Sequence, residues 1–338
     1  MKIIFIFITI LFLTSCKSYN KDQVQDVSKN ILATIDSVPI GYDEADNLIK
    51  QELYDELSRI YLIRKVTLEQ VIKDKILQLE AKKLNSTVQE LKNSLYKNKV
   101  NDANLENFTR NTNYPGQVPE LREKLVFHDV KSAKGKELLT IRYKEYLLNQ
   151  YIDSLKKTHQ INISLKPPKP PVVKIDNLIV HYKGNLKSKV TFLVISDFDC
   201  HMCRESNSFF EKLYSEYRDK VRFGFTHYSS YVSNSAIASE CAGNQGKFWE
   251  IHDSIFNAKL IPDSIALFRM AKNLELDMNT FGNDFKNKGL SDKIHNNLLK
   301  LESAGIYGTP TIMINNQLVF NSTSLNEIEG MLKEEVEK

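Results

Sequence analysis

In the first half of the chain, apolar residues recur with the period of an α-helix. Residues 42–114 contain neither glycine nor proline, and their apolar positions recur near the spacing of one helix face. Examples are Leu48, Leu53, Leu57, Ile60 and Leu62. Residues 31–40 alternate between apolar and polar positions, which favours a short strand. The first half is therefore predicted to be mostly α-helical after this strand.

Two local signals place helix starts in this half. Ser86 is followed three residues later by Gln89, a pair that predicts a capping box with the helix opening at Thr87. A further helix is predicted over residues 136–157, directly after Gly135.

The second half alternates strand and helix patterns. The sequence predicts a strand over residues 190–197, a helix over 202–217 and a strand over 221–226, an order suited to parallel pairing. A helical insertion is expected between about 229 and 305. Its predicted helices cover 235–242, 247–256, 264–271 and 291–301.

The chain is expected to close with a hairpin and a helix. Residues 311–315 and 318–320 flank Asn316 and Gln317 as two short strands. Ser324 with a glutamate three residues later predicts the cap of the last helix.

A proline-rich stretch separates the two halves. Four of the nine prolines lie within residues 166–174, where Lys-Pro-Pro-Lys-Pro-Pro forms a stiff spacer. The expected organisation is a helical domain over 31–165, this linker, and an α/β domain over 175–338.

The first fifteen residues have the pattern of a secretory signal peptide. Lys2 supplies a short basic region and residues 3–13 are almost unbroken apolar, too short to span a bilayer as a helix. The segment ends Leu-Thr-Ser-Cys, which resembles the bacterial lipoprotein signal, where cleavage precedes a lipid-bearing cysteine. Cys16 is then the expected lipid anchor, with 16–30 as a tether. An ordinary cleaved signal or a short membrane anchor with an incidental cysteine remains the alternative.

The net charge of the chain limits the classes of partner that it can bind. Removal of residues 1–15 leaves 45 basic minus 42 acidic residues, or +3, which is too weak to indicate nucleic-acid binding. An exported dithiol protein usually makes, reshuffles or reduces disulfides of other proteins.

The sequence Cys-His-Met-Cys at residues 200–203 is the strongest chemical signal. It follows an apolar strand pattern and opens a helix pattern, so Cys200 is expected at a helix N-terminus, where the helix dipole and backbone donors favour the thiolate. Cys203, one turn later, can resolve a mixed disulfide formed at Cys200.

The order strand, CxxC helix, strand, hairpin and helix resembles the thioredoxin fold, with Gly308-Thr309-Pro310-Thr311 at the place of that family's cis-proline. The helical insertion and the segments 196–200, 245–253 and 305–311 resemble the DsbA-like branch of extracytoplasmic oxidoreductases. The resemblance implies that the Thr309-Pro310 loop lies beside the cysteines and leaves a backbone edge for substrate.

Two positions depart from the DsbA-like pattern. His201 and Met202 replace the usual proline-containing pair between the cysteines, so they are candidates for tuning the redox potential, and a protonated His201 could stabilise the thiolate. Val194 stands six residues before Cys200, where many relatives carry a buried acid. Proton transfer to Cys203 must then use another group or water.

The helical half has a looser resemblance. A short strand, a long helix and the Ile-x-x-x-Ile-Leu-x-x-Glu-Ala-Lys pattern ending at Lys82, followed by Ser-Thr-Val-Gln-Glu-Leu, resemble the chaperone region of SurA-like periplasmic folding factors. This resemblance implies a cradle for unfolded polypeptide. A helical spacer that lifts the redox domain off the membrane is the alternative.

The remaining chemical residues predict structural roles. Cys241 lies among alanines of a helical pattern and is expected to be a small buried thiol. The other histidines show no paired metal-ligand spacing, so surface or structural roles are expected and no metal or cofactor is predicted. Phe248 and Trp249 are expected in the core.

The leading interpretation is a lipid-anchored thiol-disulfide oxidoreductase on the extracytoplasmic side of a bacterial cell envelope. Its expected partners are exported proteins with cysteines and a membrane redox protein that recycles the CxxC pair, while the helical domain captures unfolded clients. The direction of electron flow stays open. Two alternatives are a Cu(I)-binding protein using the Cys-His-Met-Cys donors and a chaperone with secondary thiols.

Overall fold

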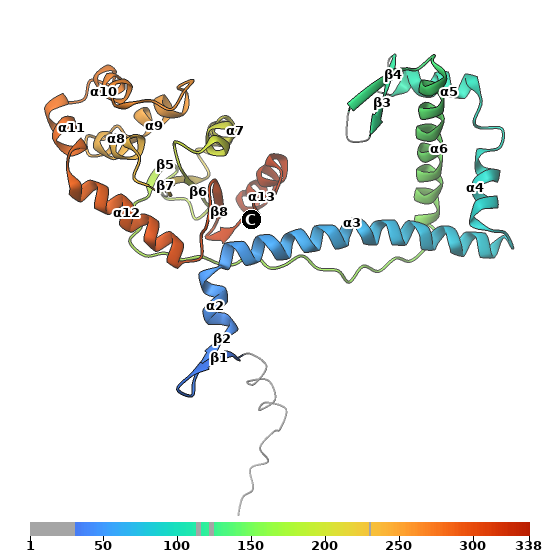
Figure 1. The fold of residues 1–338 in the computed structure, drawn as a ribbon, viewed down its shortest axis with the longest axis horizontal. Coiled ribbons are helices and arrows are strands. Elements are labelled where there is room, and N and C mark those ends of the chain that lie inside the picture. The colour runs from blue at the N-terminus through green and yellow to red at the C-terminus, as the bar shows by residue number, and fades with distance from the viewer. Residues whose placement is uncertain (1–30, 113–115, 122–124, 230) are drawn as a thin grey trace, which may run out of the picture. The chain divides into compact units, whose positions relative to one another are not determined.

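The computed structural model describes residues 31–338 except 113–115, 122–124 and 230. The predicted signal peptide, Cys16 and the tether lie outside the described residues. Contacts divide the described chain into two units, one comprising residues 31–56 and 169–338 and the other residues 57–168 (Figure 1). The sequence pattern predicts a helical domain over residues 31–165, whereas contacts place residues 31–56 in the first unit.

A five-stranded mixed sheet forms the centre of the first unit, in the order β5-β7-β6-β8-β9. Strand β6 pairs in parallel with β7 and antiparallel with β8, which follows from the βαβ pattern and the hairpin that the sequence predicts. The strands are β5 (His181–Gly184), β6 (Thr191–Ser196), β7 (Arg222–His227), β8 (Thr311–Ile314) and β9 (Gln317–Leu318).

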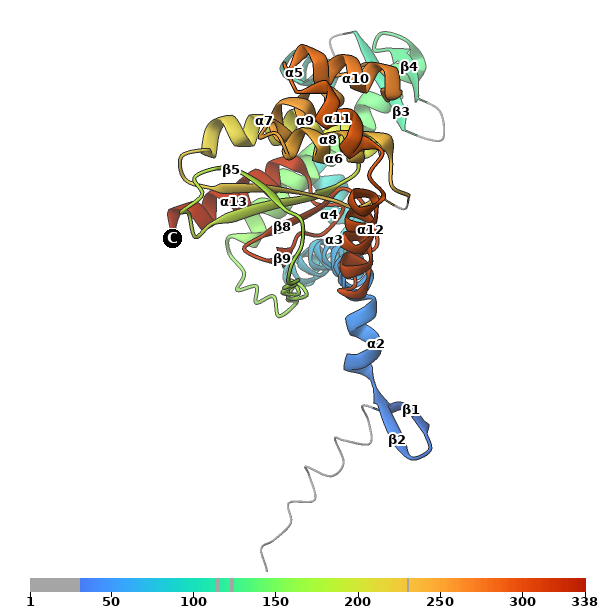
Figure 2. The same ribbon diagram turned by 90° about the vertical axis from the view of Figure 1, so that its left-hand side faces the viewer.

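Alternating side chains give this sheet two buried faces. Phe192 and Val194 of β6 pack with residues of α7 (His201–Tyr217) and α13 (Leu325–Glu337), whereas Ile195 packs with Leu301 of α12 (Lys288–Ser303). Because successive strand residues point to opposite faces, one strand serves both layers. The sheet is the central layer seen edge-on among these helices in Figure 2.

Four helices form the insertion between β7 and α12 and enclose a third hydrophobic cluster. They are α8 (Asn234–Gly243), α9 (Phe248–Phe256), α10 (Ser264–Asn273) and α11 (Met278–Phe285). The sequence predicts α8, α9, α10 and α12, but α11 and the short strand β5 have no predicted counterpart. Phe248 is buried in this cluster and Trp249 packs against it.

The closing elements follow the predicted order with one shift. Ser324 caps α13 in a capping box with Glu327, as the sequence predicts. The hairpin turn lies at Asn315 and Asn316, not at Asn316 and Gln317, because these two asparagines have φ values of 51° and 64° and asparagine tolerates that left-handed region.

The first unit also contains the beginning of the described chain. Residues 31–40 form a hairpin of β1 (Ile31–Ile35) and β2 (Val38–Gly41) rather than one strand, because the chain reverses at Asp36 and Ser37, both with positive φ. Helix α2 (Tyr42–Leu48) and the first residues of α3 (Lys50–Lys83) follow.

The second unit is mostly helical. After α3 come α4 (Val88–Tyr96), α5 (Asp102–Asn111) and α6 (Ala133–Lys156), with the hairpin of β3 (Gln117–Leu121) and β4 (Leu125–Asp129), which the sequence does not predict. Its hydrophobic cluster joins Leu77 and Ala81 of α3 to Leu91 and Ile152. Across both units, no helix of the described residues combines the length and apolar character needed to cross a bilayer.

Two helix starts in this unit differ from the prediction. The capping box that opens α4 joins Thr87 and Glu90, not Ser86 and Gln89, because the Thr87 hydroxyl accepts from the Glu90 N–H and the Glu90 carboxylate accepts from the Thr87 N–H. Helix α6 begins three residues earlier than expected because the Ser132 side chain accepts from the Gly135 N–H.

Candidate active site

Cys200 lies at the N-cap of α7, between the end of β6 and the first helical turn. Its sulfur accepts a hydrogen bond from the Cys203 N–H at 3.4 Å, and its thiol faces the Thr309 carbonyl oxygen at 3.7 Å. A sulfur that receives a backbone donor at a helix N-terminus is well placed to carry negative charge. Both cysteines are free thiols, so the structure corresponds to the dithiol form.

Cys203 lies in a different environment. Only 1% of it is exposed, and burial raises the pKa of its thiol to about 12, although hydrogen bonds with Ser196, Asp197 and Thr309 act in the opposite direction. At neutral pH Cys203 is therefore a protonated thiol that must lose its proton before it can attack a disulfide.

The loop before β8 completes the surroundings of Cys200. The peptide bond between Thr309 and Pro310 is cis, and the Thr311 hydroxyl donates to the Gly308 carbonyl oxygen at 2.7 Å. A side chain at Gly308 would meet no atom within 4 Å, so the surface at this point is open. Thr309 and Pro310 thus lie beside Cys200, which is the position that the resemblance implies for a substrate-binding edge.

The two residues between the cysteines point to solvent. The His201 side chain is 84% exposed and its Nε2 lies 3.2 Å from the Glu205 carboxylate, while Met202 is 56% exposed. Cys203 is buried, so the four donor side chains of Cys-His-Met-Cys do not converge on one point. This geometry does not favour the Cu(I) alternative.

A polar loop positions Cys200 from the strand side. Asp197 accepts hydrogen bonds from the Asp199 N–H at 2.9 Å and from the Ser229 hydroxyl at 2.7 Å, and its carbonyl oxygen accepts from the Cys200 N–H. Burial raises the pKa of Asp197, although both of these hydrogen bonds oppose that shift. Both aspartates lie within the segment 196–200 that resembles the DsbA-like branch, and the sequence alone predicts no role for either.

A cavity of about 30 Å³ lies behind Cys203. Its lining includes Ser196, Asn207 and Val194, so the position where many relatives carry an acid is an apolar wall in this chain. The volume is sufficient for one or two water molecules, and the Ser196 hydroxyl and Asn207 amide are polar groups that could bind them.

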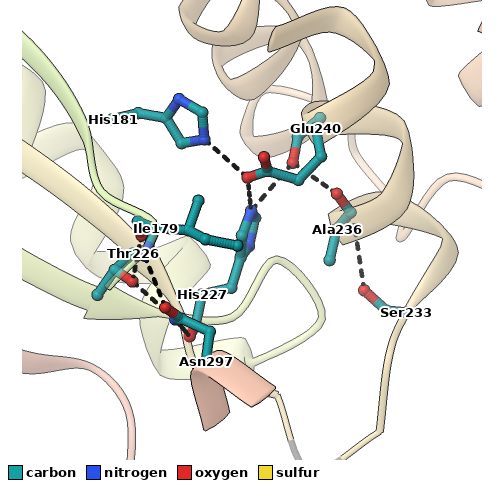
Figure 3. Close-up of polar contacts among 9 residues, drawn as sticks. Ile179, His181, Thr226, His227, Ser233, Ala236, Glu240 and Asn297 are labelled. Carbon is teal, nitrogen blue, oxygen red and sulfur yellow. Dashed lines mark hydrogen bonds and ion pairs between the residues drawn. The ribbon is translucent and has the colours of Figure 1, made fainter. Parts of the chain in front are cut away.

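A buried carboxylate cluster braces the sheet of the same unit (Figure 3). Glu240 of α8 accepts from His181 Nε2 at 2.7 Å and from His227 Nε2 at 2.9 Å. Burial opposes ionisation of Glu240, but the hydrogen bonds from both histidines lower its pKa to about 2. Asn297 of α12 donates to Thr226 and to the His227 carbonyl oxygen, so the cluster joins β5, β7, α8 and α12.

This cluster was missed by the sequence reasoning. Its partners lie far apart along the chain, and the available signal was a glutamate within an alanine-rich helix pattern, where a charged residue on an apolar face needs a buried partner. Cys241, next to Glu240, is fully buried, and burial raises the pKa of its thiol to about 12.

Sheet order, the CxxC pair at the N-terminus of α7 and the adjacent cis-proline loop define a thioredoxin-like fold, preceded by a mostly helical region. Residues 177–334 match the family model described as Thioredoxin.

Curated relatives match about half of the chain at low identity. The chain is 25% identical over 179 residues to a Na(+)/H(+) antiporter NhaA of Herminiimonas arsenicoxydans, covering 52% of this chain and 28% of that protein. It is 22% identical over 169 residues to Disulfide bond formation protein D of Bacillus subtilis, covering 45% of this chain and 75% of that protein. The chain therefore spans about a quarter of the length of the antiporter relatives.

Two solved structures are similar to about half of this chain. Oxidised BdbD from Bacillus subtilis matches at a TM-score of 0.43 and 20% identity, covering 50% of this chain and 98% of that one. The thiol-disulfide exchange protein alpha-DsbA2 from Wolbachia pipientis matches at a TM-score of 0.42 and 22% identity, covering 47% and 89% respectively.

Proposed function

We propose that this protein is a thiol-disulfide oxidoreductase of the bacterial cell envelope that acts on cysteines of exported proteins. The observation that carries the proposal is the placement of Cys200 at the N-terminus of α7, with its sulfur 3.7 Å from the Thr309 carbonyl oxygen and the buried Cys203 one turn behind it. One accessible sulfur, one resolving sulfur and an adjacent open backbone are the parts that disulfide exchange needs.

In the oxidising direction, a client thiolate attacks Cys200 of the Cys200–Cys203 disulfide, and the sulfur of Cys203 leaves with the electron pair and takes a proton. A second client thiolate then attacks the client sulfur of the mixed disulfide and expels Cys200 as a thiolate. The client dithiol loses two electrons and two protons; the CxxC pair gains both electrons and the proton on Cys203, and the second proton goes to solvent when Cys200 leaves as a thiolate. Reduction of a client is the same sequence reversed, and the reduction potential decides the direction.

The helical unit is proposed to bind unfolded clients. Its part of α3 carries exposed apolar side chains, among them Ile63 at 62% and Val66 at 69% exposure. A cavity of about 720 Å³ between α5, α6 and the β3–β4 hairpin offers a second surface. Exposed apolar side chains on a helix are suited to transient contact with unfolded chains, which themselves expose apolar residues.

The envelope location is proposed from the sequence. The signal pattern of residues 1–15 and Cys16 support a lipid-anchored protein, and a membrane redox protein is the proposed partner that restores the CxxC pair. Palmitate labelling of the full chain tests the anchor, with Cys16→Ser expected to abolish incorporation.

Exchange with a defined client tests the activity. Oxidised protein is mixed with reduced, unfolded lysozyme, reduced protein is mixed with oxidised lysozyme, and alkylated thiols are counted by mass. Transfer in at least one direction, lost in Cys200→Ser, is expected. Absence of transfer in both directions contradicts the proposed activity.

Client capture has a separate test. The double variant Ile63→Ser with Val66→Ser is expected to slow exchange with unfolded lysozyme and to leave exchange with a short cysteine peptide unchanged. Ile265→Ser, which removes a side chain 71% exposed on α10, is the matched control. Equal rates on lysozyme for the double variant and the control contradict capture by α3.

A further inference from the structure

The first turns of α3 are hydrogen-bonded to the loop that carries the cis-proline. The Gln51 side chain donates from Nε2 to the Thr311 hydroxyl at 2.6 Å and accepts at Oε1 from the Tyr307 N–H at 3.1 Å. One amide group therefore joins both ends of the segment 307–311, from a position 260 residues earlier in the chain. Only 3% of Gln51 is exposed.

A second side chain on the same helix face repeats this arrangement. The Asp55 carboxylate accepts from the Tyr307 hydroxyl and from the Asn321 N–H, each at 3.0 Å. Asp55 is 1% exposed, and the spacing of four residues places it one turn after Gln51. Tyr54, between them, packs against the cluster that contains Ile306.

The backbone at Gly305 lies in close contact with the first turn of α3. The Gln51 N–H donates to the Gly305 carbonyl oxygen at 2.9 Å. A Cβ atom at Gly305, whose φ is +81°, would lie 2.6 Å from the Lys50 nitrogen and 2.7 Å from the Asn47 carbonyl oxygen. Glycine is therefore required both by the backbone conformation and by the close approach of the helix.

The held loop is the one that faces the reactive sulfur. Thr309, in the middle of the segment joined by Gln51, presents its carbonyl oxygen to the Cys200 thiol. Within the part of the chain that the structure describes, no group accepts a hydrogen bond from the Thr309 N–H, so this backbone edge is available to an incoming chain. A loop that pairs with a substrate backbone must hold its geometry, because small displacements at a reacting centre reduce rates strongly.

We propose that Gln51 is a positioning residue for disulfide exchange, which fixes the Gly308-Thr309-Pro310 segment so that it can hold a client backbone against Cys200. This inference rests on the proposed oxidoreductase activity. It makes the segment 47–56 a working part of the active site, although the family match begins only at residue 177. Asp55 supports the same loop through Tyr307.

Gln51→Ala tests the proposal, with Gln78→Ala as the matched control, because Gln78 is exposed on the same helix and alanine preserves helix propensity at both positions. Single-turnover exchange with reduced, unfolded lysozyme is measured over a range of lysozyme concentrations. Gln51→Ala is expected to raise the half-saturating lysozyme concentration about 5- to 10-fold. The reduction potential and the rate with glutathione are expected to stay at the values of the control.

The outcomes separate the two proposals. Wild-type protein that exchanges with lysozyme while Gln51→Ala behaves like Gln78→Ala overturns the positioning role. Wild-type protein without exchange overturns the proposed activity itself. If Gln51→Ala does not fold, Thr311→Val removes the hydroxyl partner from the other side of the same hydrogen bond, and an unchanged half-saturating concentration in that variant also overturns the positioning role.

Discussion

Cys200 and Cys203 lie one turn apart on α7 and have opposite environments. Cys200 is partly exposed at the N-cap, beside the cis-proline loop, whereas Cys203 is 1% exposed and has a pKa of about 12. The Cys200 sulfur is accessible to a client protein, and the Cys203 sulfur is not. The two cysteines therefore have different roles: Cys200 forms the mixed disulfide with a client, and Cys203 resolves it.

The largest change in exchange rate is expected from replacement of Cys200. Cys200→Ser removes the only CxxC sulfur that a client can reach, so exchange with reduced lysozyme is expected to fall at least ~10³-fold. Cys241→Ala, at a fully buried thiol of the insertion, is the control and is expected to retain the wild-type rate. Residual exchange in Cys200→Ser within tenfold of wild type would show that Cys203 is accessible to clients.

Replacement of Cys203 leaves the first step intact. In Cys203→Ala the reduced protein can still attack a client disulfide through Cys200, but no second sulfur resolves the product. A mixed disulfide with oxidised lysozyme is therefore expected to accumulate, visible as a covalent complex on a non-reducing gel and released by dithiothreitol. A variant that turns over without this complex would contradict the resolving role of Cys203.

The features that the residue pattern alone predicts are local, whereas the position of the Thr309-Pro310 loop beside Cys200 comes from the family resemblance. The CxxC motif between a strand and a helix, the Ser324 cap and most insertion helices depend on residues close together in the chain, so period and spacing were sufficient to predict them. The short elements β5 and α11 are not predicted, because four to eight residues carry too little periodic signal. The predicted position of the hairpin turn is wrong by one residue, because Asn315-Asn316 and Asn316-Gln317 are both polar pairs that suit a turn.

The supporting contacts of the site could not be predicted in this way. Gln51 meets Thr311 across 260 residues, and Glu240 meets His181 across 59. Gln51 carries no sequence signal, because a glutamine on a predicted helix has the same pattern as an exposed one. The position of Glu240 among alanines indicates a buried partner but does not identify His181 as that partner. Burial of these groups results from the tertiary fold, which also explains why residues 31–56 lie in the unit of the redox site.

Glu240 is expected to stabilise the fold without taking part in disulfide exchange at Cys200 and Cys203. Glu240 has a pKa of about 2 in the folded protein against an ordinary 4.5, so its stabilising contribution is present above about pH 4.5 and is lost as the pH falls toward 2. Glu240→Gln is expected to lower the free energy of unfolding at pH 7 by about 3 kcal/mol, because His181 and His227 lose their charged partner.

Urea unfolding followed by Trp249 fluorescence from pH 7 to pH 3 checks this prediction. The difference between wild type and Glu240→Gln should shrink as the pH falls below about 4.5, while exchange at 25 °C in the folded variant should match wild type. A difference that stays constant over this range would assign the loss to packing rather than to the carboxylate charge.

The smallest effect is expected at His201, the residue next to Cys200 that the sequence marks as a tuning candidate. Its side chain is 84% exposed and is paired with Glu205 on the same helix, so solvent screens its charge and the carboxylate offsets it.

His201→Ala is therefore expected to change the exchange rate by less than about twofold, with Glu205→Gln as the control that leaves the imidazole unpaired. Rates measured at low and high salt test this, because a direct effect of charge at His201 on the Cys200 sulfur would make the loss in His201→Ala larger at low salt. A ratio near one at both salt concentrations leaves the burial of Cys203, and not the residue beside Cys200, as the source of the difference between the two cysteines.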